Sequence, residues 1–104
     1  MVTAIRNNDF ASVEKASLAL VDFSATWCGP CKMLSPVVDA LSEKYAGKVA
    51  FFNADVDEND ELAAKFGIMS VPSLILFRNG KKIDQHIGFA PAPQLQGWID
   101  SHFV

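Results

Sequence analysis

The sequence is poor in cysteine, in charge of one sign and in long apolar runs. Two cysteines among 104 residues are too few for the disulfide framework of a small secreted domain. A formal net charge of −3 argues against a nucleic-acid backbone as a partner, because such a partner requires a basic surface. No apolar run approaches about 18 residues, so we expect no membrane-spanning segment.

The start of the chain also lacks the features of a targeting segment. Residues 1–6 have neither the basic beginning nor the apolar middle of a secretory signal peptide. Together with the scarcity of cysteine, this predicts a protein of the reducing cytoplasm. The composition, 50% hydrophobic and 20% charged, predicts one globular domain spanning residues 1–104, without repeats, linkers or low-complexity segments.

Apolar periodicity and turn residues divide the chain into alternating strands and helices. The pattern predicts strands at about residues 2–5, 18–23, 49–55, 73–77 and 83–87, the last two forming a hairpin around Asn79-Gly80. It predicts a small helix capped from residues 7–9, a long one from the cysteines to about Tyr45, a short one ending at Gly67, and a last one with Pro93 in its first turn. This order implies a mixed sheet with helices on both faces.

The same patterns assign side chains to buried faces. The uniformly apolar segment 18–23 predicts a central strand covered on both sides, in which Asp22 is either buried or at a solvent-facing strand end. Gly88 is expected where another backbone approaches closely, and the acidic segment 57–61 on a solvated face that balances a helix dipole. The helices are expected to bury Phe10, Val13, Met33, Leu34, Val37, Val38, Leu41, Tyr45, Leu62, Ala63, Phe66, Leu95, Trp98, Ile99 and His102.

Cys28 and Cys31 stand where the central strand is followed by the long helix. A sulfur at the N-terminus of a helix is close to unpaired backbone N–H groups and to the positive end of the helix dipole, which stabilise a thiolate. The thiolate is the nucleophilic form of cysteine, so this position favours reactivity. Cys31 lies one helical turn further on, close enough to form a disulfide with Cys28. We expect Cys28 to be the exposed member of the pair.

Four uses of this cysteine pair compete. A purely structural disulfide that closes so short a loop contributes only about 2 kcal/mol in the chain-entropy model. A zinc site requires further ligands, and His86 and His102 have no usual ligand spacing. Haem attachment requires a histidine where Lys32 stands, and an iron–sulfur cluster normally requires about four cysteines. Thiol–disulfide redox chemistry is therefore favoured over the other three uses.

The motif Trp27-Cys-Gly-Pro-Cys31 resembles the active-site motif of the thioredoxin family, and the resemblance covers nearly the whole chain. Val21-Asp22-Phe23, Val71-Pro72, Asn79-Gly80 and Gly88 also stand where that family carries matching elements. The resemblance implies an α/β thioredoxin fold, with a central five-stranded mixed β-sheet flanked by four helices. It also implies a protein-disulfide reductase that binds no cofactor itself.

The resemblance further implies the roles of individual residues. Cys28 is expected to attack a client disulfide as the nucleophile, and Cys31 to resolve the mixed disulfide. Asp22 is expected to be buried nearby and to accept a proton, and Gly29 and Pro30 complete the motif. The expected partners are a thioredoxin reductase that draws electrons from NADPH, and cytosolic clients such as ribonucleotide reductase or peroxiredoxins. The chain itself is expected to act as a monomer.

Val71-Pro72 resembles the cis-proline loop of the family, whose backbone binds an extended client segment by strand addition. An apolar surface around Cys28 is expected to contact the client, although ordinary core filling is the alternative for Met69 and Phe89. Lys32 is expected to be a solvated helix residue or to have a minor electrostatic role. The expected members of the client-binding surface are Trp27, Gly29, Pro30, Met69, Val71, Pro72, Gly88, Phe89 and Ala90.

Two positions depart from the family pattern. Ser24 stands where many thioredoxins carry a second tryptophan, and Asn53 where a lysine usually reaches toward the buried aspartate. Without that cation, we expect the pKa of Asp22 to be raised at least as far as in lysine-bearing relatives. The alternative functions are an oxidant or isomerase, in which histidine usually replaces Pro30, and a binding module, which would not need the cysteines.

Overall fold

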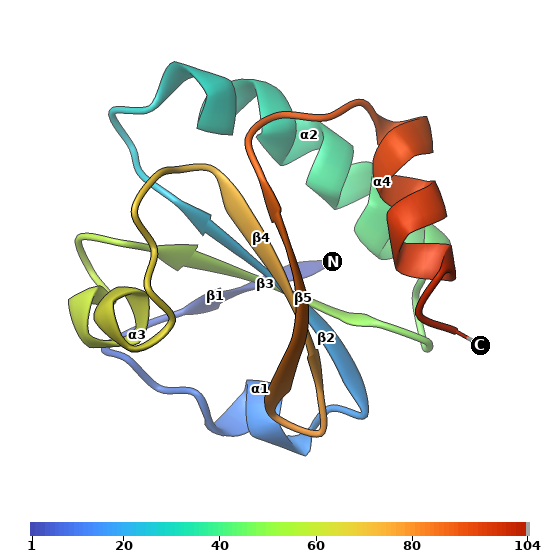
Figure 1. Ribbon diagram of the computed structural model, residues 1–104, viewed down its shortest axis with the longest axis horizontal. Helices are drawn as coiled ribbons and strands as arrows, with labels where there is room; N and C mark the ends of the chain where they lie inside the picture. The colour runs from blue at the N-terminus through green and yellow to red at the C-terminus, as the bar shows by residue number, and fades with distance from the viewer. Residues whose placement is uncertain (104) are drawn as a thin grey trace.

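A five-stranded mixed sheet forms the middle layer of the protein, shown in Figure 1 as a computed structural model that describes residues 1–103. The strand order is β1-β3-β2-β4-β5, with β2 parallel to β3 and antiparallel to β4. Helices α2 and α4 cover one face, and α1 and α3 cover the other. The elements are β1 Val2–Ile5, α1 Ala11–Lys15, β2 Leu18–Ser24, α2 Gly29–Lys44, β3 Ala50–Asp55, α3 Asp60–Lys65, β4 Ser73–Arg78, β5 Lys81–Ile87 and α4 Ala92–Asp100. The predicted fold class is therefore confirmed.

The central strand β2 is buried along its whole length except for its last residue, Ser24. Side chains alternate between the two faces of a strand. Leu18 and Leu20 accordingly pack with α2 and α4, whereas Val21 and Phe23 pack with α1 and α3. Because both faces are covered, both sets of positions are apolar, which is why this segment shows no polar alternation.

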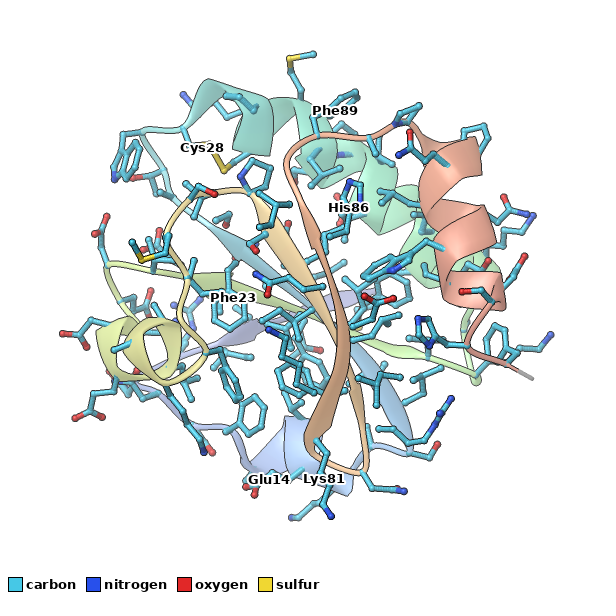
Figure 2. All side chains as sticks on the ribbon, in the orientation of Figure 1. Glu14, Phe23, Cys28, Lys81, His86 and Phe89 are labelled. Atoms are coloured by element: carbon cyan, nitrogen blue, oxygen red, sulfur yellow. A yellow bond between two sulfur atoms is a disulfide. The ribbon has the colours of Figure 1, made fainter. Side chains whose placement is uncertain are left out.

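The hairpin between β4 and β5 turns at the predicted Asn79-Gly80 pair. Both residues have positive φ angles, 52° and 81°, as the tight turn favoured in hairpins requires. A Cβ atom at Gly80 would also lie 3.2 Å from the Cα atom of Glu14, so the turn packs against α1. Figure 2 accordingly shows Glu14 and Lys81 together at one end of the molecule, with Cys28 at the other.

The predicted burial of Met33 was wrong, because its side chain is 62% exposed. Successive residues of a helix are about 100° apart, and the buried face of α2 is centred on Leu34, Val38 and Leu41. Met33 lies beyond the edge of that face. Six other residues expected to be buried are only half-buried: Phe10, Val37, Ala63, Phe66, Trp98 and His102.

The expectations about the start of α1 and about Gly88 also need correction. Phe10 rather than residues 7–9 occupies the N-cap position of α1, although Asp9 Oδ1 accepts a hydrogen bond from the Ala11 N–H at 3.1 Å. Gly88 has a φ angle of 91°, and a Cβ atom there would meet nothing within 4 Å. The Pro72 backbone does approach Gly88, whose N–H donates to its carbonyl oxygen, but a Cβ atom would not meet it, so glycine is favoured here by the backbone conformation.

Helix α4 packs on the sheet through Leu95 and Ile99, which are fully buried. Its C-terminal end is held by Asp84 of β5, whose Oδ2 accepts a hydrogen bond from Trp98 Nε1 at 2.8 Å and lies 2.8 Å from His102 Nε2. No helix within residues 1–103 is long and apolar enough to cross a membrane.

Gly97 lies inside α4 and is exposed, and a Cβ atom there would meet nothing within 4 Å. We predict that Gly97→Ala raises the free energy of unfolding by about 0.5–1 kcal/mol, because alanine loses less backbone entropy in a helix. Gly67→Ala is the matched control, since its φ of 63° strains any other residue and should lower stability by about 1 kcal/mol. Urea denaturation measures both values, and a Gly97→Ala variant no more stable than the wild type would contradict the prediction.

Candidate redox site

Cys28 and Cys31 lie at the junction of β2 and α2, at the end of the molecule where Figure 2 labels Cys28 and Phe89. Cys28 is the N-cap residue of α2 and has an extended backbone. Pro30 lies in the first turn of the helix, where its missing N–H costs no helical hydrogen bond. The two cysteines form a disulfide, with Cα atoms 5.3 Å apart.

Two features of the helix start act on the Cys28 sulfur. The backbone N–H of Cys31 donates a hydrogen bond to Cys28 Sγ over 3.2 Å. The 16 residues of α2 also align their peptide dipoles so that the positive end lies at Cys28. Both features stabilise a negative charge on this sulfur more than on that of Cys31, which lies inside the helix.

The expected exposure of Cys28 was wrong, because both cysteines are only 5% exposed. Ala25, Val56 and Val71 pack around the pair. The cysteines differ instead in their hydrogen bonding and in what they face. Cys28 Sγ accepts a hydrogen bond from the Cys31 N–H and lies 3.7 Å from the carbonyl oxygen of Val71.

The loop before β4 is brought to the cysteines by the sheet. Its Val71–Pro72 peptide bond is cis, as the resemblance implied. The Gly88 N–H donates a hydrogen bond to the Pro72 carbonyl oxygen at 2.8 Å, which joins the loop to the end of β5. Pairing of Ser73 with Ile87 continues this junction into the hairpin. The loop, the end of β5 and Cys28 are therefore neighbours.

Apolar side chains are exposed around this junction. Trp27 is 71%, Met69 95% and Phe89 42% exposed, so core filling is excluded for Met69 and Phe89. Trp27, Met69 and Val71 line one pocket of about 180 Å³, together with Val56, Ile68 and Ser70.

The other expected members of the client-binding surface differ in burial. Gly29 and Pro30 are exposed, Gly88 is half-buried, and Pro72 is buried. Ala90 was expected in the apolar surface, but it is buried in the core between the sheet and helices α2 and α4. The chain turns inward after Phe89 to begin α4, and this turn removes Ala90 from the surface.

Asp22 is buried, which excludes the solvent-facing alternative. It shares the alternation of Leu18 and Leu20 and therefore points to the face of the sheet covered by α2. A polar pocket of about 260 Å³ has both Asp22 and Cys31 in its wall. Its other lining residues are Ser24, Ala25, Thr26, Lys32, Ser35, Asn53 and Asp55.

Burial raises the pKa of Asp22 from 3.8 to about 6. The Asn53 amide lowers this pKa by a smaller amount, and the Asp39 carboxylate raises it further. Asp22 Oδ1 has no hydrogen-bond partner within residues 1–103. Asn53 Nδ2 also donates a hydrogen bond to Ser24 Oγ at 2.9 Å, and its effect on the pKa of Asp22 is smaller than that of burial.

Comparison with known proteins identifies the family. The thioredoxin family model matches residues 1–101. The chain belongs to the thioredoxin family. Thioredoxins of Staphylococcus aureus strains Mu50 and MW2 are each 44% identical to it over 101 residues, which cover 97% of this chain and 97% of each relative. Family membership and the Cys28–Cys31 pair make the chain a thiol–disulfide oxidoreductase, a protein-disulfide reductase of a family that acts on disulfide-containing substrates and has a reductase partner.

Sequence reasoning missed the contact that holds Trp27. Trp27 Nε1 donates a hydrogen bond to Asp57 Oδ2 at 3.0 Å, and the Asp57 N–H donates to Asp55 Oδ1 at 2.9 Å. Asp57 was expected only to balance a helix dipole, and Asn59, in the same acidic segment, is fully buried. No spacing in the sequence indicates a contact between residues 30 positions apart.

The raised pKa of Asp22 predicts how stability depends on pH. Asp22 keeps its proton to a higher pH in the folded protein than in the unfolded chain. Its contribution to the free energy of unfolding is therefore fully present below about pH 4 and is lost as pH rises through about 6. The loss corresponds to about 3 kcal/mol. We predict that Asp22→Asn, which cannot ionise, makes the disulfide form about 2–3 kcal/mol more stable than the wild type at pH 8.

Guanidinium denaturation of both oxidised proteins at pH 4, 6 and 8 tests this prediction. The advantage of Asp22→Asn should shrink steadily toward pH 4. Asp39→Asn is the matched control. It removes an exposed carboxylate whose charge acts on Asp22, but it leaves the buried carboxyl of Asp22 in place. Parallel stability profiles for wild type and Asp22→Asn would show that Asp22 ionises as freely in the folded protein as in the unfolded chain.

Proposed function

We propose that the chain reduces disulfides in cytoplasmic client proteins and is returned to its dithiol form by an NADPH-dependent thioredoxin reductase. The observation that carries the proposal is the hydrogen bond from the Cys31 N–H to Cys28 Sγ at the start of α2. It singles out one sulfur as the anionic nucleophile and holds the second within reach of it.

In the first step, the Cys28 thiolate attacks one sulfur of a client disulfide. A mixed disulfide forms between Cys28 and the client, and the other client sulfur leaves as a thiolate. The N-terminus of α2 stabilises the Cys28 thiolate, which is the attacking species. Gly29 and Pro30 present only small, exposed surfaces beside the sulfur, so they leave room for the client chain.

In the second step, Cys31 attacks Cys28 and releases the reduced client, leaving the Cys28–Cys31 disulfide. Their Cα separation of 5.3 Å makes this step effectively unimolecular. Asp22 accepts the Cys31 proton across the polar pocket that both residues line. A pKa of about 6 suits a proton acceptor near neutral pH, since catalytic groups act best with a pKa close to the working pH.

The client binds as an extended segment beside Val71. Backbone hydrogen bonds to this loop would add a strand to the site, and the exposed rings of Trp27 and Phe89 would cover apolar side chains of the client. The hydrogen bond between Trp27 and Asp57 fixes one wall of this surface before the client arrives. The client-binding residues are Trp27, Met69, Val71, Pro72, Gly88 and Phe89.

The chain acts as a monomeric single domain of residues 1–104. Its clients are cytosolic enzymes that form a disulfide in each turnover, such as ribonucleotide reductase and peroxiredoxins. The exposed side chains of Trp27, Met69 and Phe89 support transient apolar contact with such proteins.

Reduction of insulin tests the proposed function. The chain is mixed with a thioredoxin reductase, NADPH and insulin, and NADPH absorbance is followed. NADPH consumption that requires both the chain and insulin is expected. If the reductase reduces the Cys28–Cys31 disulfide but insulin adds no further consumption, the chain is a binding module or an oxidant and not a reductase.

The two cysteines should differ in trapping. We predict that Cys31→Ser accumulates mixed disulfides with client proteins, because the resolving thiol is missing, whereas Cys28→Ser accumulates none. Non-reducing gels of each purified variant incubated with oxidised insulin measure the adduct. Equal trapping by the two variants would contradict the assignment of nucleophile and resolving cysteine.

A further inference from the structure

The chain keeps all three of its methionines outside the core. Met1 is 82%, Met33 62% and Met69 95% exposed. Methionine usually fills irregular gaps in a core, but here leucine, isoleucine, valine and phenylalanine fill it. Oxidation of these thioethers would therefore leave the packing of the core unchanged and act only at the surface.

Met69 differs from the other two methionines by its position. Its side chain lines the pocket of about 180 Å³ together with Trp27 and Val71. The Val71 carbonyl oxygen lies 3.7 Å from Cys28 Sγ, so the pocket that Met69 lines adjoins the disulfide through Val71. Met33 does not line this pocket. The N-terminal ammonium of Met1 donates a hydrogen bond to Ser42 Oγ of α2, at 2.8 Å.

We propose that Met69 is an oxidation site through which peroxides weaken the binding of client proteins. The inference rests on the client-binding role proposed above for this surface. One peroxide oxygen is transferred to the Met69 sulfur: the S–O bond forms, the O–O bond breaks, and the second oxygen leaves as water. The sulfur loses two electrons and the peroxide gains them, so no other reactant is needed.

The disulfide form of the chain is the state in which this reaction is selective. Cys28 and Cys31 are bonded to each other and no free cysteine is present, so peroxide has no thiolate to attack. The exposed thioethers are then the most readily oxidised sulfur atoms. Because the product is a sulfoxide on a side chain that the redox cycle does not use, it remains when the cysteines are next reduced.

The sulfoxide changes the chemistry of the pocket wall. A flexible apolar side chain becomes polar in the wall of the pocket that Trp27 and Val71 also line. An apolar client side chain that covers it would leave the S=O group without hydrogen bonds, which is unfavourable. The cysteine geometry at the start of α2 is not altered, so the chemical steps should keep their rates.

The experiment uses the oxidised full chain treated with hydrogen peroxide, which catalase then removes. Peptide mass spectrometry measures the sulfoxide at each methionine, and insulin and the small disulfide dithionitrobenzoate serve as substrates. We expect KM for insulin to rise about three- to tenfold once Met69 is oxidised. The kcat with insulin, the rate with dithionitrobenzoate and the melting temperature should not change.

Two variants separate Met69 from general oxidation, each compared with its own untreated sample. Met33→Leu should lose affinity for insulin after peroxide as the wild type does. Met69→Leu, which keeps an apolar wall but has no sulfur there, should show no change in KM on treatment. Incubation with methionine sulfoxide reductase should restore the wild type.

The outcomes distinguish this inference from the proposed function. If the untreated chain reduces neither insulin nor dithionitrobenzoate, the proposed function fails and this inference fails with it. If it reduces both, but complete oxidation of Met69 leaves KM for insulin unchanged, only this inference is overturned. It is also overturned if treated Met69→Leu loses as much affinity for insulin as the treated wild type.

Discussion

A helix N-terminus directed at one sulfur is the interaction on which the rest of this protein depends. It requires α2 to begin where β2 ends, in the middle of the sheet and not at its edge. β2 can occupy that position only because its side chains are apolar on both faces and are covered by helices on both. The 3.2 Å contact between the Cys31 N–H and Cys28 Sγ is thus a local consequence of the whole layered arrangement.

The same arrangement contains a conflict between stability and chemistry. Asp22 occupies a β2 position that the core would fill with an apolar residue, and its Oδ1 has no hydrogen-bond partner within residues 1–103. Ionisation there is unfavourable, which raises its pKa to about 6. The burial that destabilises the fold at neutral pH also gives the carboxyl the pKa that suits its proposed role as proton acceptor for Cys31. Asp22 and Cys31 line the same pocket, so the buried carboxyl lies on the side of the sheet that Cys31 faces.

The strands and helices were predictable because apolar periodicity reports which face of an element is covered. The uniformly apolar β2 and the Asn79-Gly80 turn show this most directly. The burial of Asp22 was expected, but the burial of Cys28 and Ala90 was not predictable. Cys28 is covered by Val56 and Val71, which come from distant parts of the chain, and Ala90 is buried by the turn into α4. The cis peptide bond at Pro72 and the reducing chemistry were expected from family resemblance and not from pattern.

Position 53 shows how one neutral residue sets the electrostatics of the site. Asn53 is the β3 partner of Asp22 in the sheet register and lines the same polar pocket. A lysine there would place a cation beside the carboxylate and lower its pKa. Asn53 brings only a dipole, and it directs its amide N–H to Ser24 Oγ. The Ser24 hydroxyl accepts this hydrogen bond and lines the same pocket as Asp22. The Ser24–Asn53 pair therefore leaves burial as the largest influence on the pKa of Asp22. That pKa stays raised, at about 6.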